Sequence, residues 1–496
     1  MHYKTWLVSA VYCSAGALLG CSQSSPDISQ QSMPSQKPMN VLMIAVDDLN
    51  NYVGVWGGDA ITPNIDRLAA EGVMFQNAYA AVPACNPSRV AVLTGQRPEI
   101  TGQYTNNGNF RHRPGGEDRV TLPQYLQRHG YDTIASGKIF HHSRGLKSQA
   151  APLSDDRSWT YQSSTETGTA GAHEYVNEDG WAKWHGGLSE YDGLPIKDYI
   201  REHGIWGPIE QAKEQTGDFK TAQFCQDQLQ QERDKPFFLA CGIFRPHSPQ
   251  LAPKEFFDLY PLEQIKLPEL ADDDMQDIPQ IAQTNWSSGF ARLVKSRPDE
   301  WRRAMQGYLA STSFADAAIG KMLTALENSD YKDNTIVVLW SDHGFQLGHK
   351  DRWEKFTMWR QGANAPMIIK VPGQAAKMVQ EPVSLVDIYP TIVSLLDLPV
   401  GQQLSGHDLT PLLSTNSDAW PHAAVITYQQ GNHGILRDHW NYIRYQDGTE
   451  ELYDHRSDPN EQRNIVNQPS SKAIVQKMQQ WIPDVQIPQD EYIPGG

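Results

Sequence analysis

Basic side chains are scarce in this sequence of 496 residues, in which 42 lysines and arginines stand against 58 aspartates and glutamates. The resulting formal net charge of −16 argues against a nucleic-acid partner, because binding a phosphate backbone requires a basic surface. An anionic substrate would have to meet a locally positive pocket within this acidic protein. The hydrophobic share of 39% and the charged share of 20% are those of a folded globular protein.

Long hydrophobic runs are missing as well. The apolar run from Trp6 to Leu19 is too short to cross a bilayer and predicts the core of a signal peptide over residues 1–20. It ends in Leu-Leu-Gly-Cys21, which is similar to a bacterial lipobox and predicts a lipoprotein anchored through Cys21; a plain signal peptide is the alternative. Residues 21–38, rich in Ser, Gln and Pro, predict a flexible tether. We therefore expect a bacterial cell-envelope location, lipid-anchored in the outer membrane and facing the periplasm or the surface.

Cysteine is also scarce, with five in the chain, of which Cys13 lies in the signal segment and Cys21 directly follows it. Cys225 and Cys241 fall on a predicted helix and a predicted strand, and they could pair in an oxidising compartment. The interpretation we favour from the sequence is that both are small, buried, unpaired side chains.

The fifth cysteine opens the string Cys85-Asn-Pro-Ser-Arg-Val-Ala-Val-Leu-Thr-Gly95. Proline is excluded from a helix interior but suits its first turn, so Pro87 and the apolar run that follows predict a helix beginning just after Cys85. The free N–H groups and the dipole of a helix N-terminus favour an anion or an attacking oxyanion. One interpretation of Cys85 is therefore an activated thiolate nucleophile.

Continuous apolar runs of strand length predict the buried strands of a parallel sheet. These runs are Asn40–Val46, Lys235–Gly242 and Thr335–Trp340, and Asp132–Ser136 is predicted as a further strand. Helices are predicted at Leu122–His129, Asp218–Glu232 and Trp301–Leu326. The predicted fold class is α/β, with a catalytic domain over residues 39–415. Short strands and turns followed by a last helix predict a small antiparallel C-terminal subdomain over residues 416–496.

Polar and ionisable residues follow each of these strands. They are Asp47-Asp48, Lys138 with His141, His247, and Asp342-His343. The carboxyl ends of parallel strands form the ligand-binding edge of an open α/β sheet, so we expect these side chains to meet there. Adjacent carboxylates repel unless a cation lies between them, and hard cations prefer oxygen ligands. Taken singly, the aspartates could be helix caps, Lys138 a solvated surface lysine and His247 a structural histidine.

A basic run, Arg352, Lys355 and Arg360, follows the last of these strand ends. Such a run suits an anionic substrate. Arg352 could equally be a solvated surface charge.

The string from Cys85 to Gly95 resembles the signature of the type I, formylglycine-dependent sulfatases, C-x-P-S-R-x-x-x-L-T-G, at every specified position. Gly137-Lys138-Ile-Phe-His141 and Pro246-His247-Ser-Pro249 resemble the G-K-x-x-H and P-H-x-P elements of that family, the former in its iduronate-2-sulfatase-like branch. The resemblance implies the fold of the alkaline phosphatase superfamily, a large, mixed and mostly parallel sheet sandwiched by helices. It selects His141 rather than the adjacent His142.

The resemblance also implies the chemistry. Cys85 would be oxidised by a formylglycine-generating or sulfatase-maturating enzyme, and the hydrated aldehyde would attack sulfur. One Ca²⁺ would be held by Asp47, Asp48, Asp342, His343 and the modified Cys85, although an imidazole ligand weakens a purely physical case for calcium. The remaining catalytic residues would be Arg89, which activates the nucleophile, His247, which protonates the leaving oxygen, His141 and Lys138, which help release sulfate, and Lys355, which with Lys138 neutralises sulfate oxygens.

The function that the resemblance implies is hydrolysis of sulfate esters on a sulfated polysaccharide or oligosaccharide, such as ulvan, carrageenan, fucoidan or a glycosaminoglycan. Two alternatives stay open. One is a phosphonate or phosphate monoester hydrolase of the same superfamily. The other is a catalytically dead, polysaccharide-binding lipoprotein.

Overall fold

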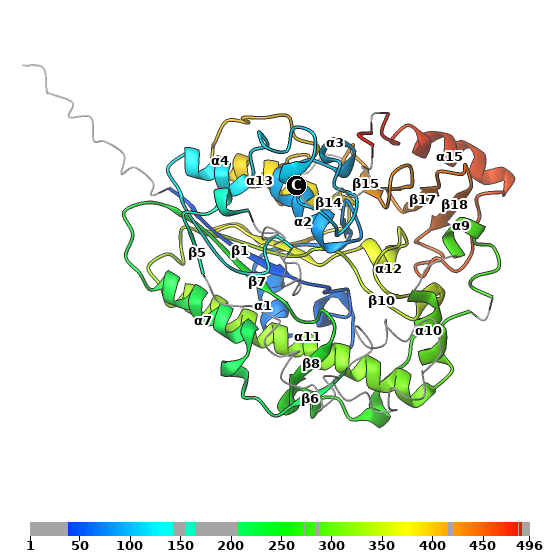
Figure 1. Cartoon of the computed structure of the whole chain (residues 1–496), viewed down its shortest axis with the longest axis horizontal. Coiled ribbons are helices and arrows are strands. Elements are labelled where there is room, and N and C mark those ends of the chain that lie inside the picture. The colour runs from blue at the N-terminus through cyan, green and yellow to red at the C-terminus, as the bar shows by residue number, and fades with distance from the viewer. Residues whose placement is uncertain are drawn as a thin grey trace, which may run out of the picture. The chain divides into compact units, whose positions relative to one another are not determined.

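An eight-stranded mixed sheet forms the centre of the chain in a computed structural model (Figure 1). The structure describes residues 38–141, 155–163, 206–271, 273–283, 287–414, 420–484 and 486–488. Contacts divide the chain into residues 1–37 and a compact unit, 38–496, which includes both the predicted catalytic domain and the predicted C-terminal subdomain. The predicted signal peptide, Cys21, nearly all of the tether and His142 lie outside the described residues.

The spatial order of the large sheet is β13 (Lys377–Val379), β2 (Val73–Phe75), β12 (Met367–Lys370), β9 (Thr335–Ser341), β1 (Asn40–Val46), β7 (Phe237–Ile243), β4 (Asp132–Gly137) and β5 (Tyr161–Gln162). Strands β9, β1, β7, β4 and β5 run parallel. Strand β12 pairs antiparallel with both β9 and β2, which makes the sheet mixed. The apolar runs seen in the sequence are its central strands, because a strand covered on both faces has no polar side.

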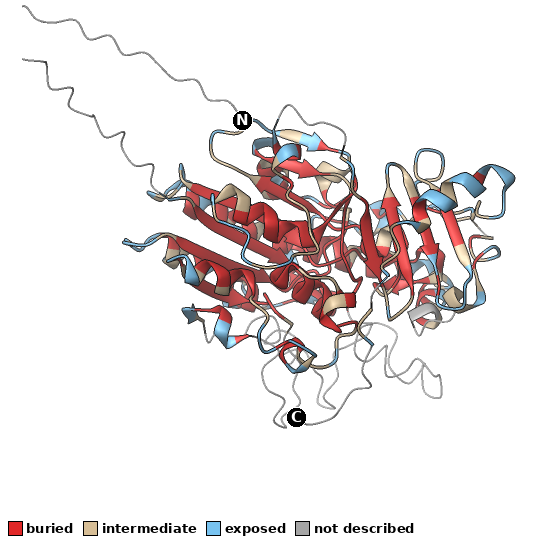
Figure 2. Ribbon diagram, turned by 90° about the horizontal axis from the view of Figure 1, so that it is seen from above, coloured by how far each residue is buried: buried red, intermediate tan, exposed pale blue. Residues whose placement is uncertain are grey.

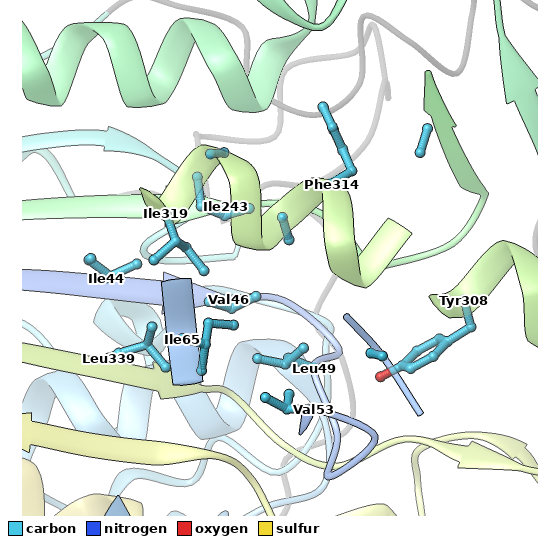
Figure 3. Close-up of a cluster of buried hydrophobic side chains, with 14 of the residues drawn as sticks. Ile44, Val46, Leu49, Val53, Ile65, Ile243, Tyr308, Phe314, Ile319 and Leu339 are labelled. Carbon is cyan, nitrogen blue, oxygen red and sulfur yellow. The ribbon is translucent and has the colours of Figure 1, made fainter. Parts of the chain in front are cut away.

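Helices cover both faces of this sheet. The helices in the described part of the chain are α1 (Pro63–Glu71), α2 (Cys85–Thr94), α3 (Pro98–Thr101), α4 (Leu122–Arg128), α7 (Gly217–Leu229), α8 (Lys254–Phe257), α9 (Gln280–Gln283), α10 (Ser287–Lys295), α11 (Pro298–Glu327), α12 (Arg360–Ala363), α13 (Ile388–Leu395), α14 (Thr410–Leu413) and α15 (Lys472–Gln479). On β1, Ile44 and Val46 pack with α1, α7 and α11 in one core (Figure 3). Val41 and Met43 point to the other core, with α2, α4 and α13. The alternation follows from the period of two along a strand.

A second, antiparallel sheet carries the end of the chain. Its order is β15 (Ala424–Thr427), β16 (His433–Arg437), β17 (Trp440–Arg444) and β18 (Glu450–Asp454). One face packs against residues that include Met358, Trp359 and Ala363. The other face is covered by α15, whose outer side is exposed (Figure 2). Three two-stranded pairs complete the described structure: β3 (Ala78–Tyr79) with β14 (Val383–Ser384), β6 (Trp206–Ile209) with β8 (Gln250–Pro253), and β10 (Gln346–Leu347) with β11 (Trp353–Glu354). The predicted fold class is confirmed.

One preferred interpretation is wrong. Cys225 on α7 and Cys241 on β7 form a disulfide, with their Cα atoms 6.5 Å apart. Helix α7 packs directly on β7, which brings the two cysteines face to face, a contact that their sequence positions alone did not reveal. Among the described residues, no helix has both the length and the apolar character needed to cross a bilayer.

Candidate active site

The predicted strand ends meet at one edge of the large sheet. Strands β9, β1, β7 and β4 are neighbours, and Val46 lies level with both Ile243 and Ser341. Parallel strands in this register place the residues that follow them side by side. Asp47 and Asp48, which follow β1, therefore lie beside Asp342 and His343, which follow the neighbouring strand β9.

Glycines let β4 approach β7 at this edge. Gly137 has a φ of +82° and lies against Gly242, where a Cβ atom would come within 2.0 Å of the Gly242 carbonyl oxygen. A side chain at this position would therefore clash with backbone and strain its own conformation. The close approach brings Lys138, the residue that follows β4, into contact with the Asp47 carboxylate.

Helix α2 points its N-terminus at the same edge. It begins at Cys85, and Arg89 follows one turn later, so both side chains face the strand ends. The Ser88 hydroxyl donates to the Asp342 carbonyl oxygen at 2.5 Å, which fixes the helix against β9. The Cys85 sulfur lies 3.3 Å from His343 Nε2.

Asp47, Asp48, Cys85 and His343, here called the candidate metal site, each offer one ligand atom, and these atoms all lie within 4.8 Å of one another. All four side chains are buried. His343 Nδ1 donates to the Gly344 carbonyl oxygen at 2.8 Å, which leaves the Nε2 lone pair facing the group. Burial lowers the pKa of His343, so the imidazole is neutral, as a ligand must be.

Asp48 is the strained member of this group. Its φ of +61° is uncommon for a residue with a side chain. The backbone is held there by Tyr308, whose hydroxyl donates to the Asp48 carbonyl oxygen at 2.7 Å and accepts from Asn50 N at 2.9 Å. The Asp48 N–H donates to Asp342 Oδ1 at 3.1 Å.

Three buried cations face these carboxylates. Arg89 donates to Asp47 Oδ1 at 3.1 Å and to Asp342 Oδ2 at 2.9 Å. Lys138 donates to the other oxygen of Asp47, and Lys355 Nζ lies 2.8 Å from Asp48 Oδ1. The surface interpretation of Lys138 is therefore excluded.

The pKa shifts follow from this arrangement. Burial opposes ionisation of Asp47, but Lys138, His247 and Arg89 hold its pKa well below the usual range. Burial raises the pKa of Asp48 to about 7 against the attraction of Lys355, with Asp47 adding repulsion. Burial also raises the pKa of the Cys85 thiol far above its usual value, although Lys138 and Lys355 act in the opposite direction. An unmodified Cys85 is thus a poor thiolate nucleophile.

His247 lies at the rim of the group, with Nε2 at 3.9 Å from Asp48 Oδ2. Its Nδ1 donates to the Ser248 carbonyl oxygen at 2.7 Å, which fixes the ring and turns Nε2 toward the site. Asp218 holds the preceding loop by accepting from the backbone N–H groups of Phe244 and Arg245.

The other predicted residues are placed less centrally. Asp342 lies beside the candidate metal site, and its carboxylate accepts from Asp48 N and Arg89. His141 is half-buried and is the last described residue before a gap. Sequence reasoning missed Tyr308 and Asp218 as supports of the site. Both fall at positions of predicted helices, where nothing separates a supporting residue from an ordinary core or capping residue.

A helix N-terminus carrying Cys85, carboxylates able to hold a cation and three buried cations together are typical of a hydrolase that acts on an anionic ester. A family model described as Sulfatase matches residues 39–398, and one described as N-sulphoglucosamine sulphohydrolase, C-terminal, matches residues 348–487. The chain belongs to the sulfatase family, and it is a sulfuric ester hydrolase.

Similar proteins include a sulfatase of Formosa agariphila, 33% identical over 90% of this chain and 86% of the relative. Iduronate 2-sulfatase of Homo sapiens is 30% identical over 75% of this chain and 71% of the relative. Among solved structures, a protein in complex with its substrate D-glucosamine-2-N,6-O-disulfate superposes with a TM-score of 0.66 at 20% identity, covering 90% of this chain and 96% of that one. Phosphonate monoester hydrolase of Agrobacterium radiobacter gives 0.67 at 19% identity, with 89% and 94% covered. These two structures share the fold.

Proposed function

We propose that this protein is a carbohydrate sulfatase that removes a sulfate ester from a sulfated sugar, with a formylglycine made from Cys85 as its nucleophile and one calcium ion. The observation that carries the proposal is the candidate metal site at the N-terminus of α2, ringed by the buried cations Arg89, Lys138 and Lys355.

The donor set fits a divalent cation. Three buried carboxylates, Asp47, Asp48 and Asp342, are balanced by three buried cations, so the metal-free group is close to neutral. A bound divalent cation would leave a positive site inside an acidic protein, which suits the single negative charge of a sulfate ester. Oxygen donors from the aspartates favour calcium, and His343 Nε2 would add one nitrogen. The ion would neutralise charge on the sulfate oxygens and on the attacking oxygen.

The protonation state of the unmodified Cys85 thiol supports the proposal that this residue is converted to formylglycine. Burial raises the pKa of its thiol, so the unmodified side chain would be neutral at physiological pH. Formylglycine would supply a hydroxyl group of its hydrated aldehyde for in-line attack on sulfur. Because the modification is made by another enzyme, a formylglycine-generating or sulfatase-maturating enzyme is a required partner.

The surrounding residues would bind the ester and move protons. Lys138 and Lys355 would contact sulfate oxygens, and Arg89 would stabilise the ionised nucleophile through its position one turn along α2. His247, with Nδ1 donating to a carbonyl oxygen, would carry its transferable proton on Nε2 and give it to the departing sugar oxygen. His141, with Lys138, would assist release of sulfate.

The substrate class comes from the relatives. One is named an ulvan-active sulfatase, at 26% identity over 92% of this chain, and others are named iduronate 2-sulfatases. Sulfated polysaccharides or their oligosaccharides, with ulvan, carrageenan, fucoidan and glycosaminoglycans as candidates, are therefore the substrates to screen.

We place the protein in the bacterial cell envelope, anchored through a lipid on Cys21. The lipobox-like end of the signal segment supports this, and so does the Cys225–Cys241 disulfide, because disulfides persist in oxidising compartments such as the periplasm. Labelling cells with a fatty-acid analogue tests the anchor. The wild type should be labelled and the Cys21→Ala variant should not.

The activity is tested by parallel assays on an aryl sulfate and the matching aryl phosphate, with protein co-expressed with a formylglycine-generating enzyme. We expect the sulfate to be turned over far faster. A preference for phosphate or phosphonate would support the alternative that the shared fold of phosphonate monoester hydrolases suggests. Binding of a sulfated oligosaccharide without any turnover would support a polysaccharide-binding protein, and a Cys85→Ala variant that still turned over sulfate would contradict the mechanism.

A further inference from the structure

A cavity of about 290 Å³ lies where the segment after β11 faces two turns of the small antiparallel sheet. Arg352 and residues 356–359 form one wall, and the β15–β16 and β17–β18 turns form the other. Ile281 and Ala282 complete the lining. The side chains that line it include Arg352, Phe356, Tyr428, Gln429, Asn432 and Gln446. None of these residues belongs to the candidate metal site.

Arg352 is the unusual member of this lining. Its side chain is fully buried, which corrects the interpretation of a solvated surface charge. Its guanidinium donates to the carbonyl oxygens of Asp351 and Ala282, and its Nε has no hydrogen-bond partner. Among the described residues, no carboxylate lies within ion-pair distance of it. The guanidinium also lies over the Trp359 ring, 5.6 Å from its centroid. A buried charge without a carboxylate partner is costly, and an anion in the cavity would compensate it.

The nearest acidic residues are engaged elsewhere. Asp351 pairs with Lys295 at 2.6 Å. The buried Glu451 accepts from Trp359 Nε1 at 2.8 Å and from the Tyr445 hydroxyl at 2.6 Å. Neither carboxylate forms an ion pair with Arg352, so an anion that enters the cavity would have no carboxylate to displace.

The rest of the cavity suits a sugar ring. The rings of Phe356 and Tyr428 lie 6.1 Å apart between centroids, and both side chains are only partly buried. Aromatic faces pack against the apolar faces of sugars, and amide side chains such as that of Gln429 can bond to hydroxyl groups. A cavity with an aromatic wall and one buried cation matches a sugar that carries an acidic group.

This cavity and the candidate metal site share a wall. Phe356 follows Lys355, whose Nζ lies 5.8 Å from the Phe356 ring centre and 2.8 Å from Asp48. The Phe356 N–H donates to the carbonyl oxygen of Pro83, two residues before Cys85, at 3.0 Å. A saccharide bound at the site would thus have its next residue within reach of the cavity.

We propose that this cavity is a subsite for a second, acidic sugar residue, neighbouring the residue that loses its sulfate, and that Arg352 binds its carboxylate or sulfate group. The inference rests on the proposed carbohydrate sulfatase activity. It makes Arg352 a residue that determines substrate specificity and takes no part in bond cleavage.

The test compares an aryl sulfate with disaccharides that share one sulfated residue and differ in the neighbour, which is a uronate, a second sulfated sugar or a neutral sugar. For Arg352→Gln we expect KM to rise about tenfold or more on substrates with an acidic neighbour, as for loss of a charged hydrogen bond. Turnover of the aryl sulfate and of the neutral disaccharide should change less than about twofold. Arg352→Lys should recover part of the loss, and Arg444→Gln, an exposed arginine on β17, is the matched control.

The pattern across substrates decides the result. A loss confined to the uronate assigns the subsite to a carboxylate, and a loss confined to the second sulfated sugar assigns it to a sulfate. An equal loss on all substrates, or no loss on any, would overturn the inference. Failure of the wild type on every sulfate ester would instead refute the proposed function. In that case, binding of the uronate disaccharide to wild type and Arg352→Gln, measured by calorimetry, tests the subsite alone, and equal affinities would contradict it.

Discussion

Lys355 Nζ lies 2.8 Å from one carboxylate oxygen of Asp48 and 2.9 Å from the other, and both side chains are buried. The ammonium thus bridges the two oxygens of a residue in the candidate metal site. Burial alone would lower the pKa of Lys355, but the adjacent Asp48 holds it well above its usual range. In the proposed mechanism, this pair would connect the lysine that contacts sulfate to the residues that hold the metal.

Removing one partner of this pair should lower the free energy of unfolding more than removing both. Lys355→Gln leaves Asp48 buried among other carboxylates, and we expect the metal-free protein to lose about 3 kcal/mol of unfolding free energy. The double variant Lys355→Gln/Asp48→Asn should recover much of that stability while remaining inactive. Chemical denaturation and sulfate-ester assays measure the two effects. A double variant as unstable as Lys355→Gln would show that the pair contributes no charge balance.

Calcium binding should strengthen as the pH rises. Burial raises the pKa of Asp48 to about 7 in the metal-free protein, and the ion requires the ionised carboxylate. We therefore expect a larger calcium-induced rise in Tm at about pH 8 than at about pH 5.5. Removal of metal with a chelator should abolish turnover, and added calcium should restore it.

Without bound metal, Asp48 should make the folded protein less stable as the pH rises. The folded-state pKa of Asp48 lies above its ordinary value of 3.8, so its contribution to stability is present below about pH 4 and is lost as the pH rises through about 7. Burial raises the pKa of Asp387 to about 7 as well, and that group titrates in the same window. The difference between wild type and Asp48→Asn isolates Asp48. Identical pH profiles of these two metal-free proteins would contradict the assignment.

The role of His247 should depend on the leaving group. A sugar alkoxide needs a proton as the ester bond breaks, whereas an activated phenolate leaves without one. His247→Gln should therefore lower kcat on a sugar sulfate by about 10²–10⁴-fold and on a 4-nitrophenyl sulfate much less. Similar losses on both substrates would indicate that His247 only positions other groups.

The disulfide should stabilise the fold. It closes a loop of 16 residues between α7 and β7, and a loop of this size contributes about 3 kcal/mol in the chain-entropy description. The Cys225→Ala/Cys241→Ala variant should lose about this amount in chemical denaturation while keeping its metal affinity. Two free thiols in the oxidised wild-type protein would contradict the pairing.

Much of the fold could be predicted from the sequence, because the central strands are covered on both faces and so appear as uninterrupted apolar runs. Asn40–Val46 was predicted with the bounds that β1 has, and Asp132–Ser136 ends one residue before β4 does. The polar residues after these strands predicted the site, since parallel strands end at one edge.

Contacts between distant elements could not be predicted in this way. The Cys225–Cys241 pair depends on how α7 lies on β7, and the burial of Arg352 depends on the small sheet folding over residues 352–359. A charged residue that follows a strand is most often solvated, so nothing in the sequence around Arg352 indicated that its side chain lines a cavity. Tyr308 likewise has the spacing of a core residue, and only the structure shows its hydroxyl holding Asp48.

The mass of the peptide that contains Cys85 tests the central claim most directly. It should be measured on protein co-expressed with a formylglycine-generating enzyme and on the Cys85→Ala variant as control. We expect the wild-type peptide to be about 18 Da lighter than the cysteine form, the change from a thiol to an aldehyde. A peptide with an intact thiol in protein that nevertheless hydrolyses sulfate esters would contradict the account, because the nucleophile would then not be a formylglycine.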